Sequence, residues 1–288
     1  MQIVTDSGTD YRLAAGNDKD LDVHEVSLLV TIGESTFQDG KEKTHAEFYK
    51  LLAETSILPT TSQPSAGEFA ALYKKLAAKD PDILSIHMSS GLSGTFNSAV
   101  AGAKMTPEAN VTVVDTKTLS IGSGWQVVAA ARAIRAGWSR EKILAALKKI
   151  GDASNILFTL NELKYLIHGG RISHMKGLVA SLLQIKPIIG VDHQTGKYTQ
   201  AGQVRSFTSA LQRVAEMVQT ATAGKRMRVQ VVHTDNLEGA ETLKGLVDKL
   251  CDVQWMPIGP ISFVLGAHTG ASMIGISYAP LSLFEGLP

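Results

Sequence analysis

Cysteine is almost absent from this sequence, in which Cys251 stands alone among 288 residues. One cysteine excludes an internal disulfide and is typical of a reducing cytosol. An excess of charge of either sign is also missing: the formal net charge is +1, which argues against nucleic acid or anionic membrane as a partner. No apolar run approaches the ~18 residues of a membrane span, and the chain begins without a signal segment. We therefore expect a cytoplasmic protein with no integral membrane segment.

Several familiar catalytic motifs are lacking as well. No Gly-x-x-x-x-Gly-Lys-Ser/Thr loop is present to hold a nucleotide phosphate. The segment Gly91–Thr95 is not a Gly-x-Ser-x-Gly elbow, because its second glycine comes one position early. No His-Glu-x-x-His occurs, and the eight histidines and the cysteine show no zinc spacing. These absences predict no metal, no nucleotide cofactor and no catalytic residue of these classes.

What the sequence does contain is an alternation of strand and helix patterns with 44% hydrophobic residues. The first half predicts strands over 2–5, 83–88 and 111–114, a hairpin over 26–36 around Gly33-Glu34, and an extended loop over 59–65. Capping boxes at Thr44/Glu47 and Ser65/Glu68 begin two predicted helices, and further helices are expected over 96–104, about 126–136 and 140–150. This order favours an α/β fold whose N-terminal domain is a three-layer α/β/α parallel sheet.

A domain boundary is expected at Gly151, which reads as the C-cap of the helix over 140–150. Residues 1–151 would form the first domain, and residues 152–288 a two-layer α/β domain with a mixed sheet. The second half predicts strands over 155–160, 186–191, 197–199, 229–233, 253–256 and 274–277. Its expected helices cover 161–167, 177–183, 207–222 and 237–250, and 266–270 reads as a glycine loop.

Hydroxyl side chains gather where the predicted parallel strands end. The turns at Asp6-Ser7, Ser89–Thr95 and Asp115-Thr116 follow three such strands, and ligands of open α/β sheets bind beyond these strand ends. In Ser89–Thr95 a glycine-spaced turn leads into a helix, whose first N–H groups favour a small anion. Ser93 as a simple helix N-cap is the alternative interpretation.

Six motifs in chain order resemble the DegV family of bacterial fatty-acid-binding proteins. They are Thr5-Asp6-Ser7, Thr61-Ser62-Gln63-Pro64-Ser65, Ser90-Gly91-Leu92-Ser93-Gly94-Thr95, Tyr165–Ser173 with His168-Gly169-Gly170-Arg171, Ile185-Lys186-Pro187-Ile188 and His268-Thr269-Gly270. The resemblance extends over essentially the whole chain and implies the DegV-like two-domain fold, with a lipid site between the domains.

The resemblance implies a carrier and not an enzyme. Such proteins bind one long-chain fatty acid, such as palmitate, stearate or oleate, and present its carboxylate to a separate ATP-binding fatty acid kinase subunit. The acyl-phosphate then enters phospholipid synthesis. No cofactor is implied beyond the bound fatty acid. By motif position, the carboxylate would be bound by the residues Thr61, Ser93 and His268, with Ser62, Gly94, Thr95 and Thr269 beside them. Arg171 and Arg205 would contact the kinase or the transferred phosphoryl group.

The chain departs from the family pattern at two places. Ala271-Ser272 stand where the family has Pro-Gly, which frees φ at one position and restricts it at the next. His168 stands where the family favours lysine, which predicts a pH-dependent charge there. Two alternative functions stay open: a hydrolase with Ser93 as nucleophile and His268 as base, and a regulatory protein that senses lipid without handing it on.

Overall fold

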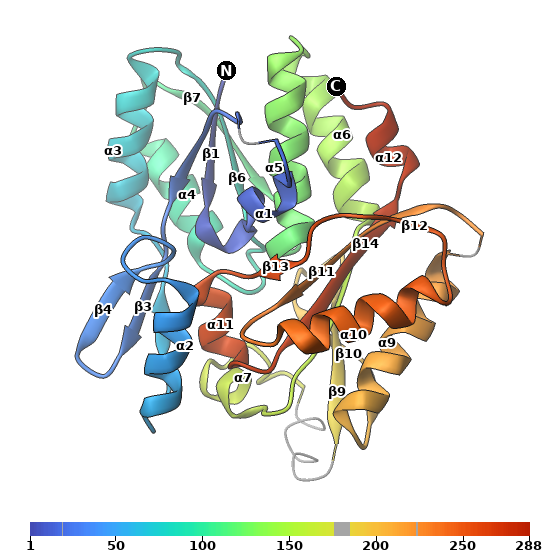
Figure 1. The fold of residues 1–288 in the computed structure, drawn as a ribbon. Coiled ribbons are helices and arrows are strands. Elements are labelled where there is room, and N and C mark those ends of the chain that lie inside the picture. Colours follow the sequence, from blue (N-terminus) through green and yellow to red (C-terminus); the bar gives the residue numbers. More distant parts are fainter. Residues whose placement is uncertain (19, 176–184, 223) are drawn as a thin grey trace.

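A parallel sheet forms the centre of the first half of the chain in the computed structural model, which describes residues 1–18, 20–175, 185–222 and 224–288 (Figure 1). Its strand order is β2-β1-β6-β7. The strands are β1 (Gln2–Asp6), β2 (Val23–Val26), β6 (Asp82–His87) and β7 (Asn110–Asp115). The register aligns Thr5 with Ile86 and His87 with Asp115. The three hydroxyl-rich turns therefore leave the sheet at one edge, as predicted.

Helices cover both faces of this sheet, because its side chains alternate between two cores. Val4 and Ile83 pack with Phe69 and Tyr73, whereas their neighbours Ile3 and Leu84 join the large central core. Figure 1 shows α3 and α4 on one face and α5 on the other. The helices of this half are η1 (Ser7–Thr9), α1 (Tyr11–Ala15), α2 (His45–Glu54), α3 (Ala66–Ala77), α4 (Thr95–Lys104), α5 (Ser120–Arg135) and α6 (Arg140–Ala153). Both predicted capping boxes are present, at the starts of α2 and α3.

A small antiparallel sheet of order β4-β3-β5 projects from the first half beside α2 (Figure 1). It consists of β3 (Leu29–Ile32), β4 (Ser35–Gln38) and β5 (Thr60–Ser62). The hairpin around Gly33 is confirmed, but Val26 belongs to β2 of the parallel sheet. The segment 59–65 is extended as expected, yet it is no loop, because its centre pairs with β3.

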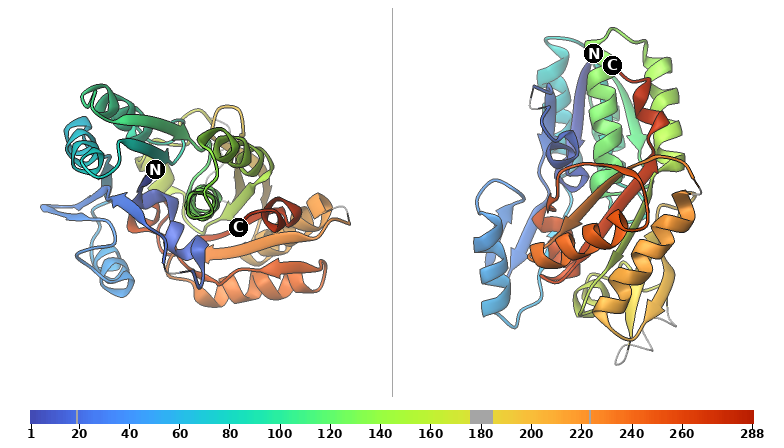
Figure 2. Two further views of the ribbon diagram at one scale, coloured as in Figure 1. Left: turned by 90° about the horizontal axis from the view of Figure 1, so that it is seen from above. Right: turned by 45° about the vertical axis from the view of Figure 1, so that its right-hand side comes forward.

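The second half forms a mixed sheet of order β10-β9-β8-β14-β11-β12, with β13 paired to β11. Its outer face packs on α9 and α10 through a core that includes Leu157, Val231 and Leu243, and Figure 2 shows these two helices on the outside. The strands are β8 (Asn155–Thr159), β9 (Lys186–Val191), β10 (Tyr198–Val204), β11 (Met227–His233), β12 (Val253–Trp255), β13 (Gly259–Pro260) and β14 (Ile274–Pro280). The helices are α7 (Lys164–His168), α9 (Phe207–Thr222), α10 (Leu237–Asp248), α11 (Phe263–Thr269) and α12 (Ser282–Glu285). The predicted helix over 177–183 lies outside the described residues.

The predicted helix over 161–167 begins only at Lys164, and the one over 237–250 ends at Asp248. Three further predictions are wrong at or near glycines. Helix α5 begins at Ser120, six residues before the predicted start. Gly124 allows a close approach of η1 and α1, because a Cβ there would lie 2.6 Å from the Thr9 carbonyl oxygen and 2.7 Å from Ala14 Cβ. Helix α6 continues through Gly151 and ends at Ala153. The expected glycine loop over 266–270 is the helix α11, which ends at Gly270 with φ 71°. In each case tertiary packing overrides the low helix propensity of glycine.

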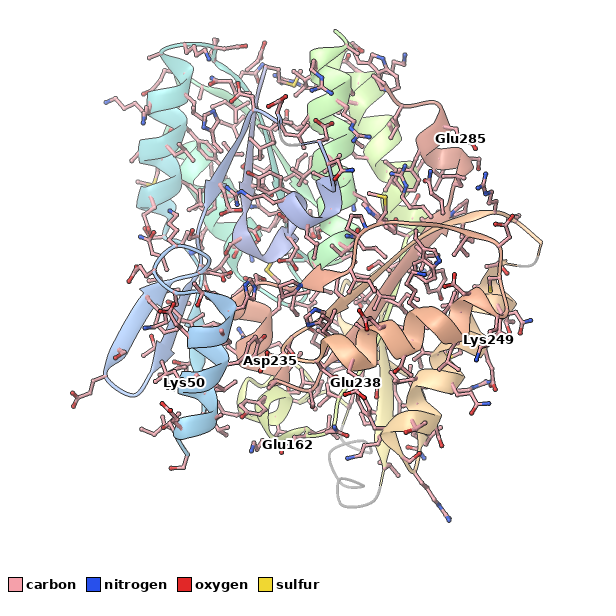
Figure 3. The ribbon with its side chains drawn as sticks, in the orientation of Figure 1. Lys50, Glu162, Asp235, Glu238, Lys249 and Glu285 are labelled. Carbon is pink, nitrogen blue, oxygen red and sulfur yellow. The ribbon has the colours of Figure 1, made fainter. Side chains whose placement is uncertain are left out.

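The α/β fold class is confirmed, and charged side chains lie on its periphery. Figure 3 shows Lys50 on α2, Glu238 and Lys249 around α10 and Glu285 on α12, all exposed. The other faces of these helices contact the cores. Within the described ranges, no helix combines the length and apolar character of a membrane span, and no group of three or more metal-ligating side chains occurs.

Candidate functional site

Two adjoining cavities lie between the carboxyl edge of the parallel sheet, α11 and the inner face of the mixed sheet. The first, of about 20 Å³, has polar and apolar walls; the second, of about 30 Å³, has mostly apolar walls. Tyr198 and Leu265 line both. The first is lined also by Leu28, Thr61, Met88, Leu92, Ser93, Arg171, Val264 and His268. The second is lined also by Leu119, Ser120, Ile156, Phe158, Val232, Ile261, Thr269, Met273, Gly275 and Ser277.

Thr61 and His268 meet in the first cavity although 207 positions separate them. Thr61 Oγ1 and His268 Nε2 share a hydrogen bond of 2.8 Å. Strand β5 places Thr61 opposite Val30 of β3, and its side chain is more buried than its exposed neighbours Thr60 and Ser62. This alternation follows from the two-residue period of a strand.

His268 is neutral in this environment. Burial, and then the positive charges of Arg171 and His168, lower its pKa to about 3. Its Nδ1 is buried and has no hydrogen-bond partner among the described residues. A buried N–H without an acceptor is rarer in proteins than a buried acceptor without a donor. We therefore place the proton of the neutral ring on Nε2 and leave Nδ1 unprotonated. The ring then donates to Thr61 Oγ1 and leaves the hydroxyl hydrogen of Thr61 free for a ligand.

Ser93 enters the same cavity from the turn after β6. Its Oγ accepts the Thr95 N–H at 3.2 Å within this turn and lies 2.8 Å from Thr95 Oγ1. Thr95 is fully buried and acts through Ser93. Gly94 lets the end of β5 approach this turn, because a Cβ there would lie 2.7 Å from Gln63 Nε2. The N-cap interpretation of Ser93 is wrong, because Gly94 is the N-cap of α4 and no side chain caps this helix.

Arg171 adds a cation to the wall of this cavity. Burial lowers the pKa of its guanidinium, which remains charged at neutral pH. One nitrogen, Nη1, donates to the Gly169 carbonyl at 2.5 Å, and among the described residues no carboxylate pairs with Arg171. A half-buried cation without a counterion, beside two hydroxyls, favours an anionic ligand.

The second cavity is apolar because the inner face of the mixed sheet carries hydrophobic and small side chains there. Ile156, Phe158 and Val232 come from the central strands, and Gly275 leaves room, since a Cβ there would lie 3.0 Å from Val232. Thr269 lines this cavity, but its hydroxyl donates to the Leu265 carbonyl at 3.0 Å within α11. The cavity therefore suits a hydrocarbon.

The tip of the β9–β10 hairpin closes over the turn that precedes Ser93. Ser89 Oγ donates to the Gly196 carbonyl at 2.8 Å. A Cβ on Gly91 would overlap the backbone at Thr195, so glycine is required at position 91 for this contact. Tyr198 follows the tip directly and reaches both cavities.

Four predicted site residues line neither cavity: Ser62, Gly94, Thr95 and Arg205. Ser62 is exposed, on the side of β5 away from Thr61. Arg205 is exposed after the end of β10, roughly 20 Å along that strand from Tyr198. Gly94 and Thr95 contribute indirectly, as described above.

Most apolar lining residues carry no motif and were not predicted. Leu28, Met88, Leu119, Tyr198, Val264 and Leu265 are ordinary core residue types. Only the pairing of strands that are distant in sequence shows which core positions face a cavity. The positions Ala271-Ser272 require no special backbone, because neither has a positive φ, and Ser272 Oγ accepts the Asn161 N–H at 2.9 Å.

Comparison with known proteins places these features in a family. The model of the DegV family, whose description is that of uncharacterised proteins, matches residues 1–281. The chain belongs to the DegV family. A DegV domain-containing protein of Staphylococcus aureus (strain MRSA252) is 33% identical over 278 residues, which cover 95% of this chain and 96% of the relative.

Solved DegV structures share the fold. A DegV family protein from Thermus thermophilus, described as binding fatty acid, has a TM-score of 0.84 and 29% identity, and the match covers 97% of this chain and 99% of that one. DegV from Bacillus subtilis, described as a fatty acid binding protein, has a TM-score of 0.85 and 29% identity, with 97% and 98% covered. The DegV motifs Thr61, Ser93 and His268 thus meet at one cavity of a DegV fold.

The DegV site offers little for the hydrolase alternative. His268 Nε2 pairs with Thr61 and has no hydrogen bond to Ser93, and within the described chain no carboxylate orients Nδ1. A serine nucleophile needs such a base, itself oriented by a third group. The arrangement suits anion binding rather than nucleophilic attack.

Proposed function

We propose that this protein binds one long-chain fatty acid, such as palmitate, stearate or oleate, with its carboxylate in the first cavity and its hydrocarbon chain in the second. The observation that carries the proposal is that Tyr198 and Leu265 line both cavities, so a polar site adjoins an apolar one. The described fatty acid binding of the DegV proteins from T. thermophilus and B. subtilis supports it.

The first cavity supplies hydrogen-bond donors and a positive charge, which a carboxylate needs when it leaves water. Thr61 and Ser93 can each donate a hydroxyl hydrogen, and Arg171 supplies positive charge. Charge-assisted hydrogen bonds are about twice as strong as neutral ones. His268, being neutral, orients the Thr61 hydroxyl and does not serve as the counterion.

The hydrocarbon supplies most of the favourable free energy, about 0.8 kcal/mol per buried CH₂ before ordering costs. The two cavities, about 30 and 20 Å³, have room for one or two water molecules each and not for a long chain. Binding must therefore move the side chains between them, and Leu265 and Tyr198 are the two that occupy this position.

The first test is mass spectrometry of an organic extract, followed by titration of delipidated protein with palmitate. Thr61→Val keeps the shape of Thr61 and removes its hydroxyl, and we expect it to weaken binding about tenfold or more. Ser62→Ala removes a hydroxyl from the exposed neighbour and should leave binding unchanged. Wild-type protein that neither contains nor takes up fatty acid would refute the proposal.

We propose further that the bound carboxylate is presented to a separate ATP-dependent fatty acid kinase, which makes an acyl-phosphate for phospholipid synthesis. The position of Arg171 at the polar cavity supports a role near a transferred phosphoryl group, and the exposed Arg205 supports a kinase contact. Arg205→Ala should slow kinase-dependent acyl-phosphate formation and leave palmitate affinity unchanged. Binding without phosphorylation by any such kinase would favour the lipid-sensing alternative.

The domain division and the location in the cytoplasm complete this proposal. The parallel-sheet strands lie between residues 2 and 115 and the mixed-sheet strands between 155 and 280, which supports domains of 1–151 and 152–288 with the lipid between them. The single Cys251 supports a reducing compartment.

A further inference from the structure

Helix α11, which carries His268, is held at its amino end by two carboxylates from the first forty residues. Asp10 Oδ1 accepts the Ser262 N–H at 2.9 Å, and Asp39 Oδ1 accepts the Phe263 N–H at 2.8 Å. Asp10 adopts a left-handed conformation with φ 46°, which is uncommon outside glycine. Asp39 follows β4 and is 1% exposed. Neither residue belongs to the fatty acid cavities.

Further contacts hold the amino end of α11 against the neighbouring helix α2. His45 Nε2 lies 3.0 Å from the Ile261 carbonyl oxygen. The ring of Phe263 stacks on that of Phe48, with centroids 4.8 Å apart and planes 19° apart. One turn later, Gly266 packs against Tyr49 so closely that a Cβ there would overlap the phenol. The start of α11 is therefore constrained along its axis by hydrogen bonds and across it by aromatic packing.

His268 lies five residues beyond Phe263, about 7.5 Å along the helix. A helix this short moves as a unit, so a shift at its amino end displaces the imidazole from Thr61. We propose that Asp10 and Asp39 are positioning residues for His268: by anchoring α11, they determine the affinity of the carboxylate site. This inference rests on the proposed function.

Burying the carboxyl groups of Asp10 and Asp39 costs free energy, which argues against an incidental role for these two residues. Desolvation raises the pKa of Asp39 to about 6 and that of Asp10 to about 7. Asp39 Oδ2 has no hydrogen-bond partner among the described residues. A cavity of about 210 Å³ with both polar and apolar walls borders both carboxylates. Water can enter it in an alanine variant and hydrate the freed N–H, so such a variant can still fold.

The test is a double-mutant cycle on palmitate affinity, measured by titration calorimetry for wild type, Asp39→Ala, His268→Ala and the double variant. We expect Asp39→Ala to weaken binding about tenfold in the wild type and less than twofold in His268→Ala, because the effect passes through the imidazole. Asp39→Asn retains an oxygen acceptor and should restore most of the affinity. Equal losses in both backgrounds, or no loss, would overturn the inference.

Two additions separate this inference from the proposed function. Glu42→Ala is the matched control, since Glu42 accepts the Gln38 N–H in the same region but is exposed and does not reach α11. The NMR signal of the His268 Cε1–Hε1 pair requires no ligand: it should shift in Asp39→Ala, return in Asp39→Asn and stay in place in Glu42→Ala. An unmoved signal overturns the positioning role, whereas a wild type that binds no palmitate overturns the proposed function alone.

Discussion

Gly169 lies directly against the imidazole of His268. A Cβ at position 169 would overlap Nδ1 of that ring, the nitrogen that lacks a hydrogen-bond partner among the described residues. Gly169, which follows α7, therefore leaves the space that lets the imidazole lie against the backbone and reach Thr61. The second glycine, Gly170, has φ 75° and nothing within 4 Å of a Cβ.

Gly169→Ala should displace His268 and break its hydrogen bond with Thr61. We expect palmitate affinity to fall at least fivefold, measured by titration of delipidated protein. Gly170→Ala is the control: it strains a left-handed backbone at a cost of about 1 kcal/mol but contacts no ring, so affinity should stay within twofold. Equal affinities of the two variants would contradict this role of Gly169.

The titration of His268 predicts how stability depends on pH. Burial lowers its pKa from 6.5 to about 3, so between these values the unfolded chain binds one more proton than the folded chain at this residue. The contribution of neutral His268 to the free energy of unfolding is fully present above pH 6.5. It is lost as the pH falls toward 3, by up to about 1.4 kcal/mol per pH unit. Urea unfolding at pH 7, 6 and 5 should show a steeper loss in wild type than in His268→Gln. Parallel curves would contradict the lowered pKa.

A second histidine forms a Ser–His–Asp arrangement that we expect to be purely structural. His87 Nδ1 lies 2.9 Å from Asp6 Oδ2, and His87 Nε2 lies 2.7 Å from Ser85 Oγ, which also pairs with Tyr73. All four side chains are fully buried, so no substrate reaches them. Ser85→Ala should lower the unfolding free energy by about 1–3 kcal/mol and leave palmitate affinity unchanged. Ester hydrolysis that disappears in Ser85→Ala would disprove this.

Leu265 lines both cavities, and we expect it to limit the rate at which a fatty acid enters. Leu265→Ala would join the cavities, accelerate palmitate binding severalfold in stopped-flow measurements and lower the unfolding free energy by about 2–5 kcal/mol. Leu243→Ala is the matched control, because Leu243 is a buried leucine of α10 that lines neither cavity. Leu243→Ala should lower the unfolding free energy by a similar amount without changing the rate of palmitate binding. A rate increase in both variants would indicate general loosening instead.

Local patterns alone predicted much of this protein. The capping boxes of α2 and α3 are side-chain contacts within four residues, and α9 has the predicted bounds because its hydrophobic repeat is regular. The resemblance of the motifs around Thr61, Ser93 and His268 to the DegV family indicated three of the residues that line the first cavity. These features can be predicted from the sequence because the interacting residues are close together in the chain or belong to an unusual motif.

Tertiary structure decided the rest. Gly151 and Gly266 were predicted to lie outside helices, and the helix that contains Gly124 was predicted to begin after it. All three lie inside helices, where a neighbouring element packs closely against the bare backbone. The lining of the apolar cavity consists of ordinary core residues, and only the register of β8, β14 and β11 turns some of them toward it. The motif residues at the first cavity could thus be named from the sequence, whereas the second cavity and the anchoring of α11 exist only once segments distant in the sequence pack together.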